Sequence, residues 1–326
     1  VDQSQSQTPI NPYNLLGLVH NSDDTLTRLI SPTCRYEDDQ SIIQDIPLNT
    51  AHKTWLRLFK PIESPRITNG DKLPIILYFH GGGFILCSAA QTIFHDFCTS
   101  LANKLPAFIL SVEYRLAPES RLPAAYNDAV QAINWVRDQA LNLNGEPLLR
   151  EFGDFSKCFL MGCSSGGNIV YHAGLQALDL DIEPLKIRGL VLNQPFFGGT
   201  QRTKSELRLV DDKILPLSMS DMMWELALPR RVDRDHKYCN PMIHGDDDKK
   251  NGLIKRCFVS VRSGDPLMDH QMEFVRMLER KGVHVVRWFD DNEKEGYHGI
   301  ELYEPQKAEV LFAALIDFVY SSEATE

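Results

Sequence analysis

Short apolar segments alternate with helical patterns along most of this chain, and that alternation is what most restricts its fold. About eight segments are rich enough in β-branched and aromatic residues to be strands, and from the third onward each is bounded by Gly, Pro, Asn or Asp at its C-terminal end. Such alternation predicts an α/β fold with a mostly parallel sheet and helices on both faces. In sheets of this kind, ligands bind beyond the carboxyl ends of the strands. The predicted strands are TLTRLI at 25–30, TWLRLFKP at 54–61, PIILYFHG at 74–81, AFILSVEYR at 107–115, KCFLMG at 157–162, IRGLVLNQP at 187–195, RCFVSVRSG at 256–264 and VHVVRWFD at 283–290.

Two stretches do not fit the alternation and predict no strand of the sheet. One is the first 24 residues, and the other runs from about residue 200 to 248 and contains LPLSMSDMMWELALP. An apolar helical segment inserted after a strand end is typical of a cap over a site, although packing on the surface of the core explains it equally well. We therefore expect one domain over residues 1–326, with both stretches as candidates for a cap.

Composition excludes several classes of partner. The formal net charge is −10 and no block of Lys and Arg occurs, so we expect no binding to nucleic acid or to anionic membranes. No segment approaches the ~20 apolar residues that span a bilayer, and the polar first residues predict no signal peptide. The seven cysteines are scattered without zinc-site spacing, which indicates a reduced, cytoplasmic setting and no metal or other cofactor. We also expect a monomer.

The segment GCSSG at 162–166 matches the pattern G-x-S-x-G and lies between a predicted strand and a predicted helix. That context is typical of a nucleophile elbow, in which a sharp turn holds a serine hydroxyl clear of the sheet at a helix N-terminus. Side chains two residues either side of the serine would collide, which explains the glycines. The register makes Ser164 the candidate nucleophile and Ser165 a source of a backbone amide, while a helix N-cap serine is the structural alternative.

The segment HGGGF at 80–84 follows the third predicted strand. Glycines allow the backbone to approach a substrate closely, and amides that point at a developing oxyanion contribute about 3 kcal/mol each. A phosphate cradle is disfavoured because no G-K-[ST] follows. A flexible turn is the structural alternative to an oxyanion loop.

A serine nucleophile needs a base, and the base needs a group that orients it. His298 lies just after the last predicted strand, whereas His80, His172 and His284 lie in the glycine loop, the elbow helix and a strand. For the acid, Asp265 follows the next-to-last strand directly. Asp269 would already be in the next helix and face elsewhere. The order Ser164, Asp265, His298 is the one expected for a hydrolase triad.

Taken together, HGGGF, EYRLAPESRLPAAYND, GCSSGGN, SGDPLMD and YHG resemble the hormone-sensitive-lipase-like group of α/β-hydrolases, and within it the plant carboxylesterases. The resemblance runs from about residue 25 to the C-terminus. It implies that Ser164, Asp265 and His298 form a catalytic triad, and that the amides of Gly82, Gly83 and Ser165 form the oxyanion hole. It also implies a cap built from residues 1–24 and 200–248, and a supporting role for EYRLAPE. One departure is Cys163, where the family often has Asp.

The resemblance implies a serine carboxylesterase that hydrolyses small to medium apolar esters through an acyl-enzyme and reacts covalently with organophosphates. Two alternatives stay open: a lyase of the isoflavanone dehydratase type, and a receptor without catalysis like the gibberellin receptors. The receptor is disfavoured because HGGGF and His298 are intact, and a serine at the elbow rather than threonine favours ester cleavage. The apolar residues expected to line the substrate pocket are Phe84, Phe197, Met222, Met223 and Trp224.

Overall fold

A single mixed sheet forms the centre of the molecule. The computed structural model describes residues 11–29, 33, 43–62, 71–244, 249–290 and 296–321. Eight strands lie in the order β10-β9-β8-β7-β5-β6-β4-β3, and only the pairs β3–β4 and β4–β6 are antiparallel. The predicted α/β fold with a mostly parallel sheet is therefore confirmed. The strands are β3 (Ile43–Asn49), β4 (Thr54–Phe59), β5 (Leu73–Phe79), β6 (Phe108–Glu113), β7 (Gly153–Cys163), β8 (Ile187–Asn193), β9 (Arg256–Arg262) and β10 (His284–Asp290).

The first predicted strand was placed wrongly. Residues 25–30 contain β2 (Leu26–Arg28), which pairs with β1 (Leu18–His20) in a separate two-stranded ribbon and not with the sheet. Its place in the sheet is taken by β3, which the sequence did not indicate because Pro47 interrupts its pattern. β3 is an edge strand, where a proline that cannot donate to a neighbouring strand is tolerated.

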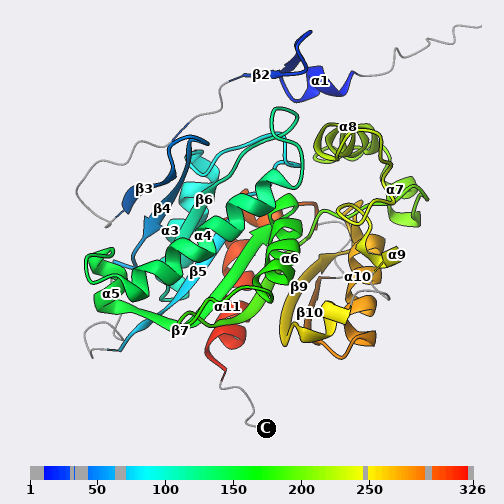
Figure 1. The fold of residues 1–326 in the computed structure, drawn as a ribbon. Helices are drawn as coiled ribbons and strands as arrows, with labels where there is room; N and C mark the ends of the chain where they lie inside the picture. The colour runs from blue at the N-terminus through cyan, green and yellow to red at the C-terminus, as the bar shows by residue number, and fades with distance from the viewer. Residues whose placement is uncertain are drawn as a thin grey trace, which may run out of the picture.

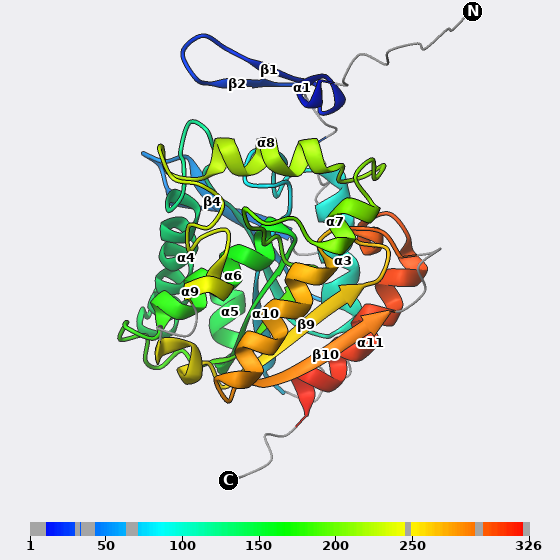
Figure 2. The same ribbon diagram turned by 90° about the vertical axis from the view of Figure 1, so that its right-hand side faces the viewer.

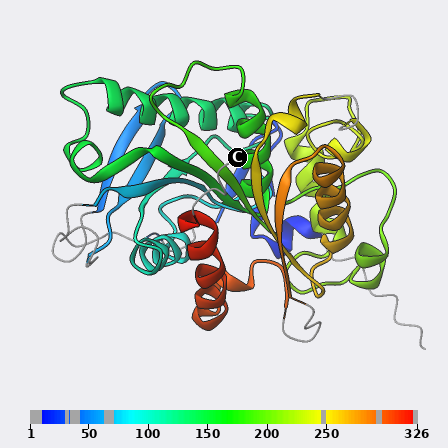
Figure 3. The ribbon, with the colours of Figure 1, turned by 90° about the horizontal axis from the view of Figure 1, so that it is seen from below.

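Helices cover both faces of the sheet, as Figure 3 shows from below. On one face, α4 (Ala124–Leu141), α6 (Ser165–Ala177) and α10 (Met268–Arg280) contribute to the larger hydrophobic core. On the other, α3 (Thr92–Lys104) and α11 (Pro305–Tyr320) build a second core. Every residue of β5 is buried, as expected for a parallel strand that is covered on both sides. The short helix α5 (Pro147–Phe152) precedes β7.

The described part of the insertion at 200–248 consists of helices joined by turns and irregular segments. It contains α7 (Lys204–Arg208), α8 (Leu217–Ala227) and α9 (Pro241–His244), and the 3₁₀ helix η1 (Lys249–Leu253) follows it. In Figures 1 and 2, α8 lies across the top of the sheet, with α1 (Pro12–Leu15) and the β1–β2 ribbon beyond it. Contacts join α1 to α8. Parts of the two stretches that departed from the strand–helix alternation, namely α1 and α8, therefore lie together at one end of the described structure.

Among the helices of the described residues, none is long and apolar enough to cross a membrane.

Candidate active site

Ser164 lies in the sharp turn between β7 and α6. Its backbone has φ 55° and ψ −120°, a conformation that non-glycine residues seldom adopt. Two hydrogen bonds of 2.9 Å hold the turn, from the Ser164 amide to the Asn193 carbonyl and from the Phe196 amide to the Ser164 carbonyl. The strained serine is thus fixed at the carboxyl end of a central strand and at the N-terminus of a 13-residue helix.

Steric contact explains the two glycines of this turn. A Cβ atom at Gly162 would lie 2.3 Å from the carbonyl carbon of Gly166, and one at Gly166 would lie 1.9 Å from the carbonyl oxygen of Phe79. Neither neighbour is a flexible side chain that could move aside. The turn can form only with glycine at both positions, as the sequence pattern indicated.

The residues on either side of Ser164 differ in chemistry. Cys163 is buried, and its desolvation, reinforced by the charges of Glu301 and Asp265, raises the pKa of its thiol well above the ordinary value. A thiol held protonated is a poor nucleophile, which argues against Cys163 as the reactive group. Ser165 is the first residue of α6, where a backbone N–H has no acceptor within the helix.

The HGGGF segment approaches Ser164 through its backbone. A Cβ atom at Gly81 would lie 3.3 Å from Cβ of Ser164, and Gly82 and Gly83 have φ values of 113° and 59°. In the described part of the chain, the amides of Gly82 and Gly83 donate to no other backbone group. These amides are therefore available to a ligand beside the serine.

The EYRLAPE segment supports this loop from below. The Tyr114 ring stacks on His80 with 4.3 Å between ring centres, and its hydroxyl donates to the His80 carbonyl at 2.8 Å. The Ala117 amide donates to the Phe84 carbonyl at 2.9 Å. Arg115 is paired at 2.7 Å with Asp128 on α4. The supporting role that the resemblance implied agrees with these contacts.

Asp265 and His298 meet as the sequence predicted. His298 Nδ1 lies 2.9 Å from Asp265 Oδ2, and both residues are buried. The other ring nitrogen, Nε2, is buried and has no hydrogen-bond partner among the described residues. Asp269 lies in the first turn of α10, where it accepts a hydrogen bond from the Ser205 amide instead. Of the two aspartates, Asp265 is the one that is hydrogen-bonded to the histidine.

The surroundings of His298 change its affinity for a proton. Burial is the largest single influence and lowers its pKa, but the charge of Asp265, the hydrogen bond to it and the charges of more distant carboxylates together raise the pKa above 6.5. The charges of Glu301 and Asp212 act in the same direction. His298 therefore takes up a proton more readily than an ordinary histidine.

Glu301 belongs to η2 (Ile300–Leu302), directly after His298. Its carboxylate accepts hydrogen bonds of 3.0 and 2.7 Å from Nε and Nη2 of Arg262, and both side chains are fully buried. Arg262 ends β9, so this ion pair joins the strand before Asp265 to the segment after His298.

The other candidate histidines lie in different environments. Burial lowers the pKa of His80 to about 4 and that of His172 to about 3. His172 stacks on Tyr126 with 4.6 Å between ring centres. His284 is exposed at the start of β10. Both buried rings are thus held neutral within the core.

The residues expected to line a pocket are all buried. Met223 packs on the glycine loop, since a Cβ atom at Gly83 would lie 2.2 Å from its Sδ. Trp224 stacks on Phe196 at 4.6 Å and contacts Phe84 at 5.5 Å. Phe197 stacks on Phe274 of α10 at 4.4 Å. Met222 is buried on α8 beside Met223. Their part in a pocket remains a prediction.

Several residues beside the predicted site went unnoticed in the sequence. Gln194 and Gln271 each donate from Nε2 to Asp265 Oδ2, at 3.1 and 2.9 Å. Arg208, from the 200–248 insertion, donates to the Ser263 carbonyl at 2.7 Å. Gln194 directly follows β8, and a position after a strand end was the one signal that could have placed it beside Asp265. Gln271 and Arg208 carry no local pattern that marks them as partners of a distant carboxylate or carbonyl.

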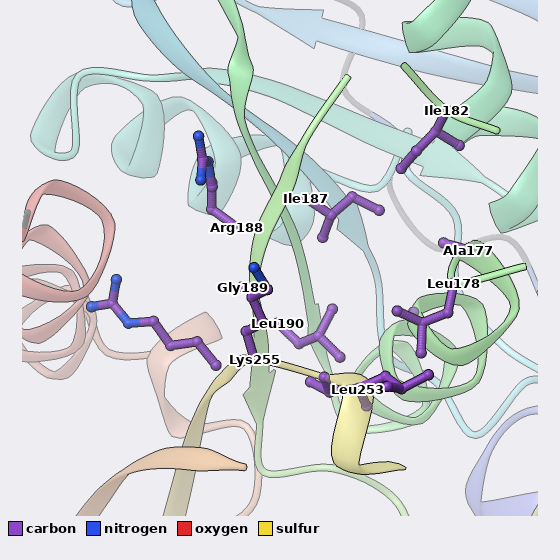
Figure 4. Close-up of a pocket in the computed structure, with 12 residues that line it drawn as sticks. Ala177, Leu178, Ile182, Ile187, Arg188, Gly189, Leu190, Leu253 and Lys255 are labelled. Atoms are coloured by element: carbon purple, nitrogen blue, oxygen red, sulfur yellow. The ribbon is translucent and has the colours of Figure 1, made fainter. Parts of the chain in front are cut away.

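A cavity of about 170 Å³ lies at the amino end of β8, the end opposite to the candidate site (Figure 4). Its apolar side chains include Leu178, Ile182, Ile187 and Leu190. Figure 4 shows Ile187 and Arg188 on opposite sides of the strand, so the arginine head points away from the apolar walls. This cavity contains none of the predicted site residues.

The fold and the elbow define the class of protein. A family model described as alpha/beta hydrolase fold matches residues 76–298. An esterase of Pyrobaculum calidifontis has the same fold, with a TM-score of 0.70 and 24% identity over 89% of this chain and 86% of that one. The chain belongs to the α/β-hydrolases.

Closer relatives place it within that class. The chain is 52% identical over 316 residues to a 3-O-acetylpapaveroxine carboxylesterase of Papaver somniferum, covering 95% of this chain and 99% of the relative. It is also 37% identical over 218 residues to a gibberellin receptor of Oryza sativa subsp. japonica, covering 66% of this chain and 58% of the receptor. The chain is a member of the plant carboxylesterases, which are related to the gibberellin receptors, and the resemblance stated from its motifs is confirmed.

Proposed function

We propose that this carboxylesterase hydrolyses small to medium apolar esters with Ser164 as nucleophile, His298 as general base and acid, and Asp265 as the group that orients His298. The observation that carries the proposal is the difference in hydrogen bonding between the two ring nitrogens of His298. Nδ1 is bound to Asp265, while Nε2 is buried without a partner among the described residues. An imidazole in this state can accept a proton from a serine hydroxyl.

The proposed reaction has two halves. Ser164 Oγ attacks the carbonyl carbon of the ester and its proton passes to His298 Nε2, which leaves negative charge on the carbonyl oxygen. The amides of Gly82, Gly83 and Ser165 stabilise that oxyanion, and the N-terminus of α6 adds its positive dipole end. Collapse breaks the bond to the alcohol, which takes the proton from His298. Water then attacks the acyl-enzyme with His298 as base, the bond to Ser164 breaks as Oγ takes that proton back from His298, and the carboxylic acid leaves.

We propose that residues 1–24 and 200–248 form the cap over this site, of which residues 1–10 and 245–248 lie outside the described residues. Support comes from Met223 of α8, whose side chain lies against Gly83, and from Asp212, whose charge acts on His298. Hydrogen bonds from Arg208 to Ser263 and from Ser205 Oγ to the Pro266 carbonyl attach the insertion to the loop that carries Asp265. Phe84, Phe197, Met222, Met223 and Trp224 are proposed to supply the apolar walls.

The name of the relative from Papaver somniferum describes the ester of an acetyl group, and the identity of 52% extends over 95% of this chain. We therefore take acetyl esters of larger alcohols as the first substrates to test. Short acyl groups also suit a site whose candidate walls are tightly packed aromatic and methionine side chains.

The test is release of p-nitrophenol from p-nitrophenyl acetate and butyrate. Ser164→Ala and Asp265→Asn should each lower kcat by about 10⁴-fold or more. Asp269→Asn is the matched control, because this nearby carboxylate binds Ser205 and not His298. Full activity in Ser164→Ala, or an equal loss in the two aspartate variants, would refute the assignment. Failure of the wild-type chain to release p-nitrophenol would favour the dehydratase or receptor alternatives.

A further inference from the structure

The side chain of Gln194 connects Asp265 to the loop that carries His298. It follows β8 directly, its side chain is fully buried, and its backbone has φ 44°. Its Nε2 donates to Asp265 Oδ2 at 3.1 Å and to the Tyr297 carbonyl at 3.3 Å. Its Oε1 accepts from the Gly299 amide at 2.8 Å. One side chain thus satisfies a carboxylate oxygen and two backbone groups.

The two backbone groups are the immediate neighbours of His298 in sequence. The Tyr297 carbonyl and the Gly299 amide lie on either side of the histidine, and Gly299 itself has φ 72° at the start of η2. Because the backbone on both sides of His298 is fixed, the imidazole ring can rotate only about its own side-chain bonds. The side-chain amide of Gln194 also binds the carboxylate of Asp265. This one planar group therefore fixes the position of the carboxylate relative to the backbone of His298.

Gln271 provides a natural comparison. It also lies fully buried, on α10, and its Nε2 donates to the same Asp265 oxygen at 2.9 Å. Its second contact is the Pro195 carbonyl at 3.5 Å, and no hydrogen bond joins it to 296–299 in the described part of the chain. The two glutamines therefore share the carboxylate but differ in their contact with the histidine segment.

We propose that Gln194 is a positioning residue for ester hydrolysis: it holds His298 Nε2 in line with Ser164 by bonding the peptide groups on both sides of His298 together with Asp265. This inference rests on the proposed triad. Misplacement of a reacting group by about 1 Å can cost a factor of about 100 in rate. The loss should appear in kcat, because Gln194 is not expected to contact the substrate.

The experiment compares Gln194→Met and Gln271→Met with the wild-type chain on p-nitrophenyl butyrate. Methionine keeps the length of the side chain and removes its hydrogen bonds. Gln194→Met should lower kcat by about 10- to 100-fold with KM within twofold, and Gln271→Met by less than fivefold. Each variant removes one donor from Asp265 Oδ2, while the charges of Asp265, Glu301 and Asp212 stay the same. With one hydrogen-bond donor fewer, the carboxylate of Asp265 attracts the proton on His298 more strongly. The midpoint of the acid limb of kcat/KM should therefore move to higher pH by a similar amount in both variants.

An equal fall of kcat in the two variants, or a loss confined to KM, would overturn the proposal. His298→Ala is measured alongside to separate the two claims. If it keeps wild-type activity, the triad itself fails; if it is inactive and the glutamine variants behave alike, only the role of Gln194 fails.

Hydrogen exchange on the wild-type chain tests the same contact without a variant. The Gly299 amide donates to the buried Gln194 Oε1, so its exchange should be slowed by at least about 100-fold relative to an open peptide. Exchange of the Gly299 amide at the rate of an open peptide would contradict the proposal, whatever the stability of the methionine variants.

Discussion

The contact between Met223 of the insertion and Gly83 of the proposed oxyanion loop leads to a prediction for the variant Gly83→Ala. Gly83→Ala introduces a Cβ that would lie 2.2 Å from Met223 Sδ and 2.6 Å from its Cγ, at a residue with φ 59°. The backbone conformation alone costs an alanine about 1 kcal/mol. The clash must displace either the methionine or the loop. Loss of one aligned oxyanion donor costs about 3 kcal/mol, a factor of 100 or more in rate.

We therefore expect Gly83→Ala to lower kcat/KM on p-nitrophenyl butyrate by about 100-fold. Met223→Ala alone should cost less than about tenfold in rate, although the cavity it leaves should lower the free energy of unfolding by about 2–5 kcal/mol. The double variant should recover roughly tenfold over Gly83→Ala, because the truncated side chain no longer meets the new Cβ. In a double-mutant cycle that recovery corresponds to a coupling energy of about 1.4 kcal/mol if Met223→Ala leaves the rate unchanged, and of about 2.8 kcal/mol if it costs tenfold.

Met222→Ala combined with Gly83→Ala is the control, since Met222 is equally buried on α8 and the nearest atoms to the new Cβ belong to Met223. Rates are measured well below the unfolding temperature of each variant. Wild-type activity in Gly83→Ala would refute the oxyanion role of this loop. Losses that multiply independently in the double variant would refute the contact between α8 and the loop.

Three further predictions concern the histidine and the apolar walls. The acid limb of kcat/KM should have its midpoint above pH 6.5, because the nearby carboxylates, Asp265 foremost, together outweigh burial and raise the pKa of His298, and only the neutral ring accepts a proton. Asp265→Asn should move the midpoint downward, and an unchanged pH–rate profile would contradict this. Glu301→Gln should also move it downward and, because it removes the fully buried one of the two carboxylates that pair with Arg262, lower the free energy of unfolding by about 3 kcal/mol in a denaturant titration; Asp290 is the carboxylate that stays. Trp224→Ala should alter the ratio of kcat/KM among acetyl, butyryl and octanoyl esters by less than about tenfold per step, and an unchanged acyl-length profile would exclude Trp224 as a pocket wall.

Much of the fold and of the candidate site follows from local sequence signals. The strand–turn–helix context located Ser164, and the positions of Asp265 and His298 after two consecutive strands brought them to the same edge of the sheet, where their side chains meet at 2.9 Å. Parallel strands impose this outcome, because their carboxyl ends share an edge. Residues that follow strand ends can thus be placed from the sequence.

Contacts that depend on side-chain reach could not be placed in this way. Gln194 spans 71 positions of sequence to reach Asp265, and Arg28 of the β1–β2 ribbon donates to the Ile85 carbonyl at 2.6 Å across 57 positions. Neither residue type has a spacing rule that indicates such a partner. The strand β3 was missed for a related reason, since its pairing partner, not its own pattern with Pro47, determines that it is a strand.

The central claim is that Ser164 is an activated nucleophile, and covalent labelling tests it most directly. The wild-type chain is treated with diethyl p-nitrophenyl phosphate, and the modified peptide is located by mass spectrometry. We predict one diethyl phosphoryl group per chain, attached to Ser164 Oγ, with loss of esterase activity in proportion to labelling. His298→Ala should react at least about 100-fold more slowly. An adduct on Ser165 or any other residue, or full activity in a completely labelled chain, would contradict the account.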